Sequence, residues 1–380
     1  MNRKAIVLAL MGLVLLGLGV VIWLVIPAGP RRPDFRMAGD SLRVGDKFVT
    51  LVVALRTPSF FESQKKRPRY GVDLVLHDVA DVSRAEILEL TARSDETKLR
   101  NEAKLLGTDG RRVWVYADTL VGFDLSTRQR VGFQELSKAN PSLAQFWVDE
   151  SKFYSVGGVE PKLRLKVADA RQFELDPATL VARAYEKEQW AKPKDYAESQ
   201  KQWVDYDDQM SMFGVGPDVY FWQGEKVGDG EWFSLMTGEE AGKVKESGVP
   251  TGRASRSSGK TSGLWTVKDR EAARVGAVEY LDAGLLRDEK AAKPMRLEGP
   301  PGYLVMHQSR LGADGTLMLT RVDLAGKKIW EVNTGIGKLY QVLPGVKYLG
   351  LIGDEPKVMI SVSVRDGSMT HEEFSLTSMK

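Results

Sequence analysis

The sequence predicts an all-β protein, and three observations lead to that prediction. Short apolar segments alternate with turns rich in Gly, Asp, Ser and Thr along most of the 380 residues. The segment LLGTDGRRVWVYADTLVGFDLSTR, residues 105–128, contains an apolar run, a turn and two strands, which together make a meander. Turns of similar composition return at intervals further along the chain. Because a small meander cannot stand alone, each must bury its apolar face against a neighbour.

Composition and charge exclude several classes of protein. Apolar residues make up 43% and charged residues 28%, as in globular proteins. The 54 basic and 51 acidic residues give a net charge of only +3, so we expect no nucleic-acid partner. The chain has no cysteine, which excludes disulfides, thiolate metal sites and a cysteine nucleophile. We expect no metal and no cofactor.

An uncharged stretch of 22 residues, 5–26, predicts a transmembrane helix. Residues 1–4 then form a cytoplasmic leader, and residues 27–46, which begin PAGPRRP, form a tether. The alternative is a cleaved signal peptide, whose apolar region is usually shorter, about 7–15 residues. Basic residues flank both ends, so the positive-inside rule barely decides the orientation. The short leader favours an inner (cytoplasmic) membrane protein, single-pass, with a periplasmic or extracellular body.

Residues 47–380 form the predicted folded domain, and most of its elements are strands. A helix is expected over 94–106, a short helix from Asn140-Pro141, an inserted helix within 186–210 and an exposed loop over 247–263. The predicted strands are 48–55, 72–76, 113–116, 119–125, 153–156, 163–167, 171–175, 219–222, 231–236, 264–267, 277–281, 303–307, 317–322, 329–332, 348–352, 358–364 and 369–376.

A repeated turn divides these strands into groups. The spacings between successive turn markers are 46, 52, 61, 45, 41 and 43 residues, and the longest contains the inserted helix. The markers are Asp78, Asp124, Asp176, Thr237, Asp282, Asp323 and Asp366. A period of about 40–50 residues with four strands each predicts a β-propeller of about seven blades (six to eight). Residues 48–55 are then expected to pair with the C-terminal strands and join the first blade to the last. A pair of β-sandwiches or an irregular β domain is the alternative.

Two segments carry a resemblance to known families. VGFDLSTRQRV, from Val121, and TRVDLAGKKIW, from Thr320, resemble the blades of quinoprotein-like and WD-like propellers. EYLDAGLLRD, PPGYLVMH and KKIWEVNTGI resemble an uncharacterised bacterial family of membrane-anchored propeller proteins. The resemblance implies the propeller fold and the membrane anchor. It implies no quinoprotein site, because adjacent cysteines and an acidic calcium-binding set are missing from the sequence.

No motif for a specific reaction stands out. ASRSSGKT, residues 254–261, matches a relaxed phosphate-loop pattern, but a polar segment precedes it and a strand is expected after it, which indicates a surface loop. His371-Glu372-Glu373 lacks the second histidine of a zinc-protease helix. The Gly-x-Ser-x-Gly turn of a serine hydrolase is absent from the sequence.

The candidate site residues are therefore polar and aromatic side chains at positions where a propeller binds ligands. His77 and His307 are candidates for a central channel, with a local hydrogen bond as the alternative role. The aromatic residues of the insertion are candidates for ligand or partner recognition, with packing against the sheet as the alternative: Trp190, Tyr196, Trp203 and Tyr206. We expect a binding or scaffolding module with a protein partner and the bilayer. The alternative is an enzyme or small-ligand sensor with its site in the channel.

Overall fold

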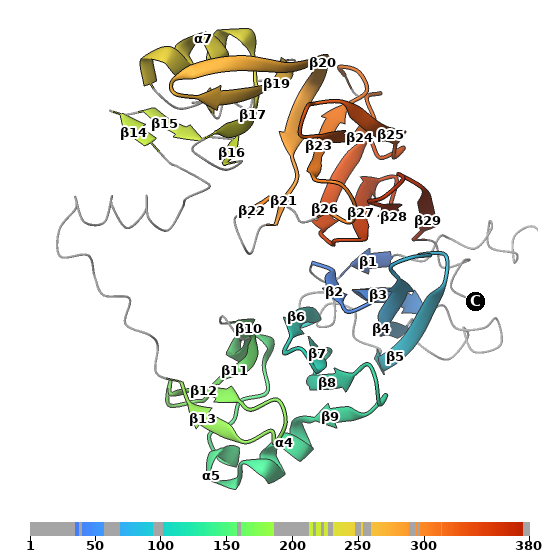
Figure 1. The fold of residues 1–380 in the computed structure, drawn as a ribbon. Coiled ribbons are helices and arrows are strands. Elements are labelled where there is room, and N and C mark those ends of the chain that lie inside the picture. Colours follow the sequence, from blue (N-terminus) through green and yellow to red (C-terminus); the bar gives the residue numbers. More distant parts are fainter. Residues whose placement is uncertain are drawn as a thin grey trace, which may run out of the picture.

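The computed structural model shows a protein built almost entirely of antiparallel sheets (Figure 1). Within the described residues, no helix is both long and apolar enough to cross a membrane. The expected leader, the expected transmembrane helix and the insertion 186–210 lie outside them. The structure describes residues 35–37, 40–56, 69–93, 102–157, 161–185, 213–215, 218–221, 224–226, 231–247, 252–253, 260–288, 293–294, 297–312 and 314–374.

Sheet A forms the N-terminal part of the described structure. Its strands are β1 (Phe35–Met37), β2 (Leu42–Val44), β3 (Lys47–Arg56), β4 (Arg69–Asp78) and β5 (Ala85–Arg93). The central strand β3 pairs with β4 along its whole length and with β1 and β2 on its other edge. Two short strands therefore occupy part of the segment expected to be a tether, and the folded region begins before Lys47.

Sheets B and C follow, with two short helices between them. Sheet B contains β6 (Lys104–Thr108), β7 (Arg112–Tyr116), β8 (Leu120–Asp124) and β9 (Arg130–Gly132). Then come α4 (Phe133–Ala139), α5 (Pro141–Ala144) and the 3-10 turn η1 (Ser151–Phe153). Sheet C contains β10 (Tyr154–Gly157), β11 (Lys162–Lys166), β12 (Gln172–Leu175) and β13 (Ala182–Ala184). Both sheets are simple meanders in which each strand pairs with the next.

Sheet E is the largest sheet and spans two repeats. Its order is β16 (Gly224–Lys226), β17 (Trp232–Met236), β19 (Thr261–Lys268), β20 (Glu271–Leu285), β23 (Gly302–Gln308), β24 (Leu317–Asp323), β25 (Lys328–Asn333). The long strand β20 pairs with β19 through its first part and with β23 through its last residues, so it belongs to both halves. Helix α7 (Gly238–Ser247) packs on the first half. Smaller sheets are D, with β14 (Phe213–Val215), β15 (Asp218–Phe221) and β18 (Gly252–Arg253), and F, with β21 (Arg287–Asp288) and β22 (Lys293–Pro294).

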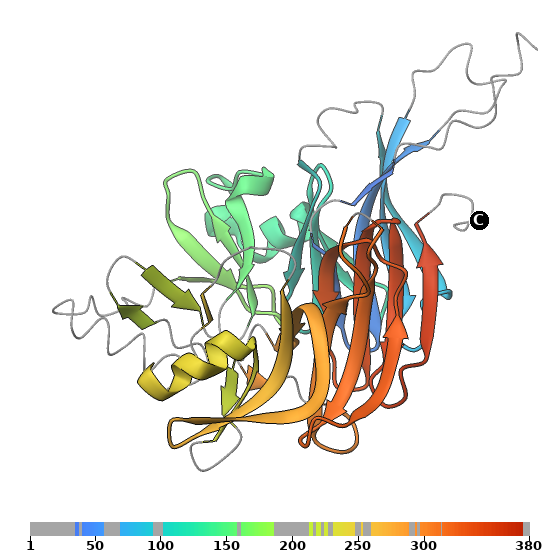
Figure 2. The ribbon, with the colours of Figure 1, turned by 90° about the horizontal axis from the view of Figure 1, so that it is seen from above.

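Sheet G ends the described structure and lies beside sheet A. It contains β26 (Lys338–Leu343), β27 (Tyr348–Glu355), β28 (Val358–Ser363) and β29 (Met369–Glu373). Phe48 of sheet A packs with Ile352 and Met359 of sheet G in one buried cluster. Figures 1 and 2 show that the two sheets lie side by side, although they come from opposite ends of the chain. The expected contact between residues 48–55 and the C-terminal strands is confirmed, but as face-to-face packing. Strand pairing between them is wrong, because β3 pairs only with strands of sheet A.

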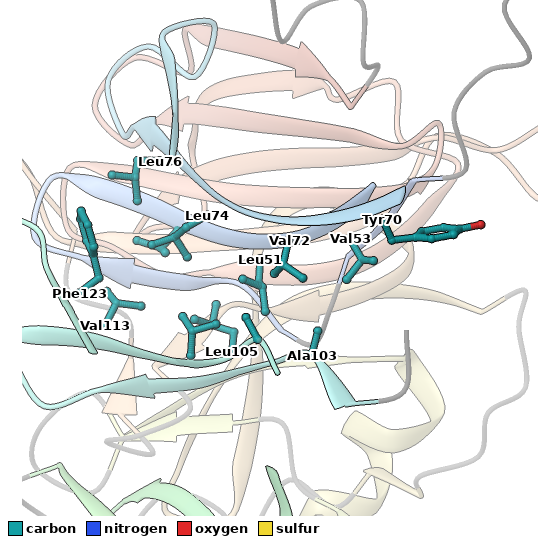
Figure 3. Packing of buried hydrophobic residues seen from close by; sticks show 13 residues of the cluster. Leu51, Val53, Tyr70, Val72, Leu74, Leu76, Ala103, Leu105, Val113 and Phe123 are labelled. Atoms are coloured by element: carbon teal, nitrogen blue, oxygen red, sulfur yellow. The ribbon is translucent and has the colours of Figure 1, made fainter. Parts of the chain in front are cut away.

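Most of the apolar clusters among the described residues lie between neighbouring sheets, and one lies between α7 and sheet E. Figure 3 shows the cluster between A and B, where Leu51 and Leu74 face Leu105 and Val113. Similar clusters join B to C through α4 and α5, the first half of E to the second, and E to G. Burial of apolar area, at roughly 25 cal/mol per Å², therefore stabilises sheets that are individually too small to fold.

The repeated acidic turn is confirmed at five positions. In each, Oδ1 of the aspartate accepts a hydrogen bond from the backbone N–H two residues later, and the turn joins the last two strands of its sheet. The five are Asp78, Asp124, Asp176, Asp323 and Asp366. Thr237 instead caps α7, since its hydroxyl accepts from the Glu240 N–H at 3.2 Å. Asp282 lies inside β20.

Two expected elements differ from the structure. The end of the expected helix 94–106 is strand β6, because its residues alternate between exposed and buried against sheet A. The expected loop 247–263 is wrong in part, because Ser247 ends α7, Gly252–Arg253 forms β18 and Thr261 begins β19. The turn predicted at Thr237 is the capping box of α7, formed with Glu240. The short helix at Pro141 is confirmed, with Asn140 at its N-terminus.

Candidate functional site

An open groove of about 430 Å³ lies between sheets A and B, at the rim where their turns meet. Its volume falls in the range of ligand sites, about 300–1,000 Å³. The β2–β3, β6–β7 and β8–β9 turns supply most of its walls, and β4 supplies part of its floor. The lining residues are Val44, Gly45, Asp46, Lys47, Leu76, Gly110, Arg111, Leu125, Ser126 and Arg128. Four separate segments of the chain therefore converge on one hollow.

Carboxylates fix the two turns that sheet B contributes. Asp109 Oδ1 accepts from the backbone N–H groups of Arg111 (2.9 Å) and Arg112 (2.7 Å). Its Oδ2 accepts from the buried indole Nε1 of Trp114 at 2.7 Å. Gly110 between them has a φ of +85°, a conformation that favours glycine. The β6–β7 wall is thus held rigidly, and a rigid wall loses little freedom when a ligand binds.

Three cationic side chains line the groove, each with one acidic partner. Lys47 Nζ lies 3.4 Å from Asp78 Oδ2, and Arg111 Nε lies 3.4 Å from Asp124 Oδ2. Arg128 Nη2 pairs more closely, at 2.5 Å from Glu86 Oε2. The three side chains are 31%, 50% and 45% exposed, in that order, so solvent reaches all of them. Exposed pairs of this kind contribute little to stability, about 0–1 kcal/mol each, and their donors remain accessible to a ligand.

Two of the acidic partners, Asp124 and Asp78, stay ionised near neutral pH. Hydrogen bonds from the Ser126 hydroxyl and the Thr127 N–H hold the pKa of Asp124 far below its usual value. The N–H of Ala80 lowers the pKa of Asp78, with a further contribution from Lys47. Carboxylates with lowered pKa values are poor bases at neutral pH. The groove is therefore suited to holding a ligand by hydrogen bonds and charge.

A second polar cluster crosses sheet E around His307. Its Nε2 lies 2.8 Å from the Thr320 hydroxyl, which donates to Glu331 Oε2 at 3.0 Å, and Lys328 Nζ holds Glu331 Oε1 at 3.2 Å. The ring of Tyr280 meets the imidazole edge-on, with centroids 5.1 Å apart. Burial raises the pKa of Tyr280 to about 12 and lowers that of His307. The tyrosine is thus protonated and the histidine neutral at neutral pH.

The order of this cluster differs from that of a catalytic triad. In a triad the histidine lies between the nucleophile and the acid, which holds its second nitrogen. Here both His307 and Glu331 contact the Thr320 hydroxyl, and Nδ1 of His307 faces the Gln308 carbonyl at 3.4 Å. Thr320 has no exposed surface. The contacts among the described residues indicate a network that ties three strands together.

The two histidines expected in a channel lie apart, in sheets A and E. His77 is fully buried in the cluster between sheets A and G. Its Nδ1 donates to the Val82 carbonyl at 2.9 Å, and its ring meets Phe374 edge-on. Burial lowers its pKa. Each histidine makes the local hydrogen bond that was the alternative role. No described residue forms a hydrogen bond or a ring contact with both histidines.

The aromatic candidates Trp190, Tyr196, Trp203 and Tyr206 lie outside the described residues. Thr261, the last residue of the phosphate-loop pattern, begins strand β19. A phosphate loop requires a helix at that position. Across the ranges that the structure describes, no group of three acidic or histidine side chains could hold a metal ion. Sequence reasoning missed the groove. The available signal was a basic residue in or next to three turns, at Lys47, Arg111 and Arg128.

Comparisons with known proteins add no family. No protein-family model matches the chain, and no curated protein matches it. Among solved structures, the chain is similar to Pyrococcus horikoshii acylaminoacyl peptidase in its orthorhombic form (10% identity, TM-score 0.25, 89% of this chain and 46% of that one). It is also similar to an acylaminoacyl peptidase bound to a chloromethyl ketone (12%, 0.24, 90% and 46%) and to an ACO/RPE65 chimera (11%, 0.21, 92% and 79%). The chain spans about half the length of these peptidases. TM-scores this low establish neither a fold nor an activity.

Proposed function

We propose that the protein is a binding module that holds a partner in the groove between sheets A and B. The observation that carries the proposal is the groove itself, an open hollow lined by accessible donors from three turns. Two carboxylates beside it, Asp78 and Asp124, are occupied by turn amides and cations, which favours recognition over acid–base chemistry. A protein partner is proposed, with the insertion 186–210 and its aromatic residues as a second contact.

For the fold we propose a β-propeller of about seven blades. The support is that a row of four paired strands recurs in sheets A, B and C, in both halves of E, and in G. Sheet A packs on B, B on C, the first half of E on its second half, E on G, and G on A, and a ring requires such contacts between neighbours. The resemblance to quinoprotein-like and WD-like blades in residues 121–131 and 320–330 points the same way.

For the location we propose a single-pass protein of the inner membrane with its body outside the cytoplasm. The support is the uncharged stretch 5–26 and the short leader before it. The body would then meet its partner at the outer face of that membrane. Protease treatment of spheroplasts tests the orientation, since the body should be digested while a cytoplasmic protein is spared.

Partner capture from solubilised membranes tests the binding role. The bait is the full chain, compared with the triple variant Lys47→Gln, Arg111→Gln, Arg128→Gln and with Lys152→Gln, an exposed lysine outside the groove. A third bait replaces 186–210 by a Gly-Ser link. We expect partners that the wild type and Lys152→Gln retain and the triple variant loses. Identical partners for the wild type and the triple variant would show that the groove does not bind the partner.

An enzyme or small-ligand sensor with a central site is the second candidate, and the His307 cluster favours it. The Tyr280 hydroxyl is buried without a hydrogen-bond partner among the described residues, next to His307 and Glu331. A buried donor of that kind could hold a polar ligand atom. Tyr280→Phe discriminates: it should abolish ligand-induced stabilisation if a site exists there, and otherwise leave the protein as stable as the wild type or more so.

A further inference from the structure

We infer that the groove between sheets A and B takes a short acidic peptide segment with aliphatic side chains, and this rests on the proposed binding function. The lining holds three cations, Lys47, Arg111 and Arg128, against a single carboxylate, Asp46. The ligand that complements this lining carries carboxylates. The class of ligand is thus set by charge, and its shape by the floor of the groove.

The cations have donors to spare for such a ligand. Arg111 meets Asp124 through Nε alone, at 3.4 Å, and its two Nη atoms make no hydrogen bond within the described part of the chain. A guanidinium binds a carboxylate best through two parallel N–H groups, which these atoms provide. Lys47 has one long contact at 3.4 Å and three N–H donors. Both side chains can therefore accept a second carboxylate without breaking a strong bond.

Arg128 is expected to contribute less than the other two. Its Nη2 lies 2.5 Å from Glu86, the shortest of the three ion pairs, so it must share or give up a closer partner. Asp124 competes only weakly with a ligand, because it is 4% exposed and engaged by the Ser126 and Thr127 amides. Asp78 and Glu86 are 33% and 44% exposed, so a ligand carboxylate meets Arg111 with the least competition.

The floor and the open turns favour a peptide over a small inorganic anion. Val44 and Leu125, both half-buried, supply aliphatic surface between the charged walls, above the buried Leu76. The groove volume of about 430 Å³ leaves room for a short extended chain between the turns. Burying one aliphatic side chain on that floor contributes affinity that phosphate or acetate cannot obtain. The occupant is therefore an acidic segment of a protein partner, with Leu, Ile or Val next to its acids.

Fluorescence anisotropy of a labelled peptide, Gly-Leu-Glu-Leu-Asp-Gly, with the full chain in detergent micelles tests this inference. Matched probes replace the acids by Gln and Asn, or both Leu by Gly; inorganic phosphate and acetate serve as competitors. We expect the amide peptide to bind at least about tenfold more weakly and affinity to fall as salt is raised. Arg111→Gln and Lys47→Gln should each weaken binding about fivefold, Arg128→Gln less and Lys152→Gln not at all. Arg111→Lys should recover part of the loss.

Each outcome decides the inference, and the probe substitutions decide it even if a variant fails to fold. Equal binding of acidic and amide peptides to the wild type overturns it. Equal binding of the Leu and Gly peptides, with displacement by millimolar phosphate or acetate, shows a general anion site. That result overturns the assignment of a peptide as the ligand. If partner capture depends on the groove but the acidic peptide does not bind, the proposed function stands and this ligand class falls. If capture is independent of the groove and the peptide does not bind, both fall.

Discussion

Asp124 shows how single carboxylates organise the rim of this protein. It is 3% exposed, and its Oδ1 accepts from the N–H groups of Ser126 and Thr127 and from the Ser126 hydroxyl. Its Oδ2 faces Arg111 in the groove wall. The same side chain therefore closes a turn and positions a cation that we assign to ligand binding. Asp366 makes the same turn at the far end of the chain but is exposed.

Removing the Asp124 carboxylate should cost more stability than removing that of Asp366. Asp124→Ala removes a buried carboxylate together with its hydrogen bonds from Ser126 and Thr127, which we expect to cost about 2 kcal/mol. Asp366→Ala exposes its amides to water, so its loss should be smaller. Urea denaturation of both variants measures the difference. Equal losses would mean that burial does not set the strength of these turns.

Stability should fall as the pH is lowered, in part through His77. Its folded pKa lies below its ordinary value of 6.5 because burial disfavours the charged ring, while the Val82 carbonyl and Glu372 oppose this shift. The unfolded chain therefore binds the proton first, and this contribution is complete above pH 6.5 and is lost as the pH falls toward the folded pKa. His307 is shifted in the same direction.

The variant His77→Phe isolates this contribution. It should be less stable than the wild type at roughly pH 7.5, because the bond to Val82 is lost, but its stability should depend less on pH down to roughly pH 5.5. Denaturation midpoints across that range provide the measurement. A pH dependence as steep as that of the wild type would show that His77 does not titrate with unfolding.

The acidic turns could be predicted at residue level, and two markers could not. Asp followed by small or hydroxyl residues closes a turn by local hydrogen bonding, so sequence suffices at Asp124 and Asp176. Thr237 has similar composition but starts a helix, and only the side chain of Glu240 distinguishes the two. The turn from β19 to β20 was missed because Asp269 and Arg270 both adopt positive φ, a conformation that neither residue type signals.

At the scale of elements, a strand is specified partly by what it packs against. Strand β8 carries Gly122 opposite Trp114 of β7, where the indole ring is fully buried. A Cβ at Gly122 would lie 2.5 Å from Cζ3 of that ring. Glycine is therefore needed for space rather than for a turn. Pattern reasoning found this strand correctly but could not show why its glycine is there.

Gly122→Ala should destabilise sheet B, whereas Gly284→Ala should not. The first substitution displaces a packed indole and its bond to Asp109, at a cost of about 1–3 kcal/mol. The second lies in β20, where a Cβ meets nothing within 4 Å. Thermal denaturation followed by near-ultraviolet circular dichroism reports on the tryptophan. Indistinguishable melting temperatures for the two variants would contradict the packing described for Trp114.

At the scale of the whole molecule, the ends of the described chain meet. Gln341 exchanges two hydrogen bonds with the backbone of Ser41, at 2.8 and 2.9 Å, and Arg43 donates to the Tyr348 carbonyl at 2.6 Å. The apolar cluster around Phe48 lies beside these bonds. The sequence indicated that contact through an apolar N-terminal strand. The sequence could not predict the form of this contact, because packing across a seam leaves no local pattern. The groove was missed for the same reason.

Cross-linking across this seam tests the central claim, that the sheets follow one another until the last meets the first. The chain has no cysteine, so Asp40→Cys with Tyr340→Cys places one thiol on each side, where the Tyr340 hydroxyl now donates to Asp40 Oδ1 at 3.2 Å. Asp40→Cys with Lys152→Cys is the control, since Lys152 immediately precedes sheet C. A short bismaleimide should join the first pair rapidly within one molecule, seen as a shift in electrophoretic mobility, and leave the control unjoined. Equal yields for the two pairs would contradict the ring.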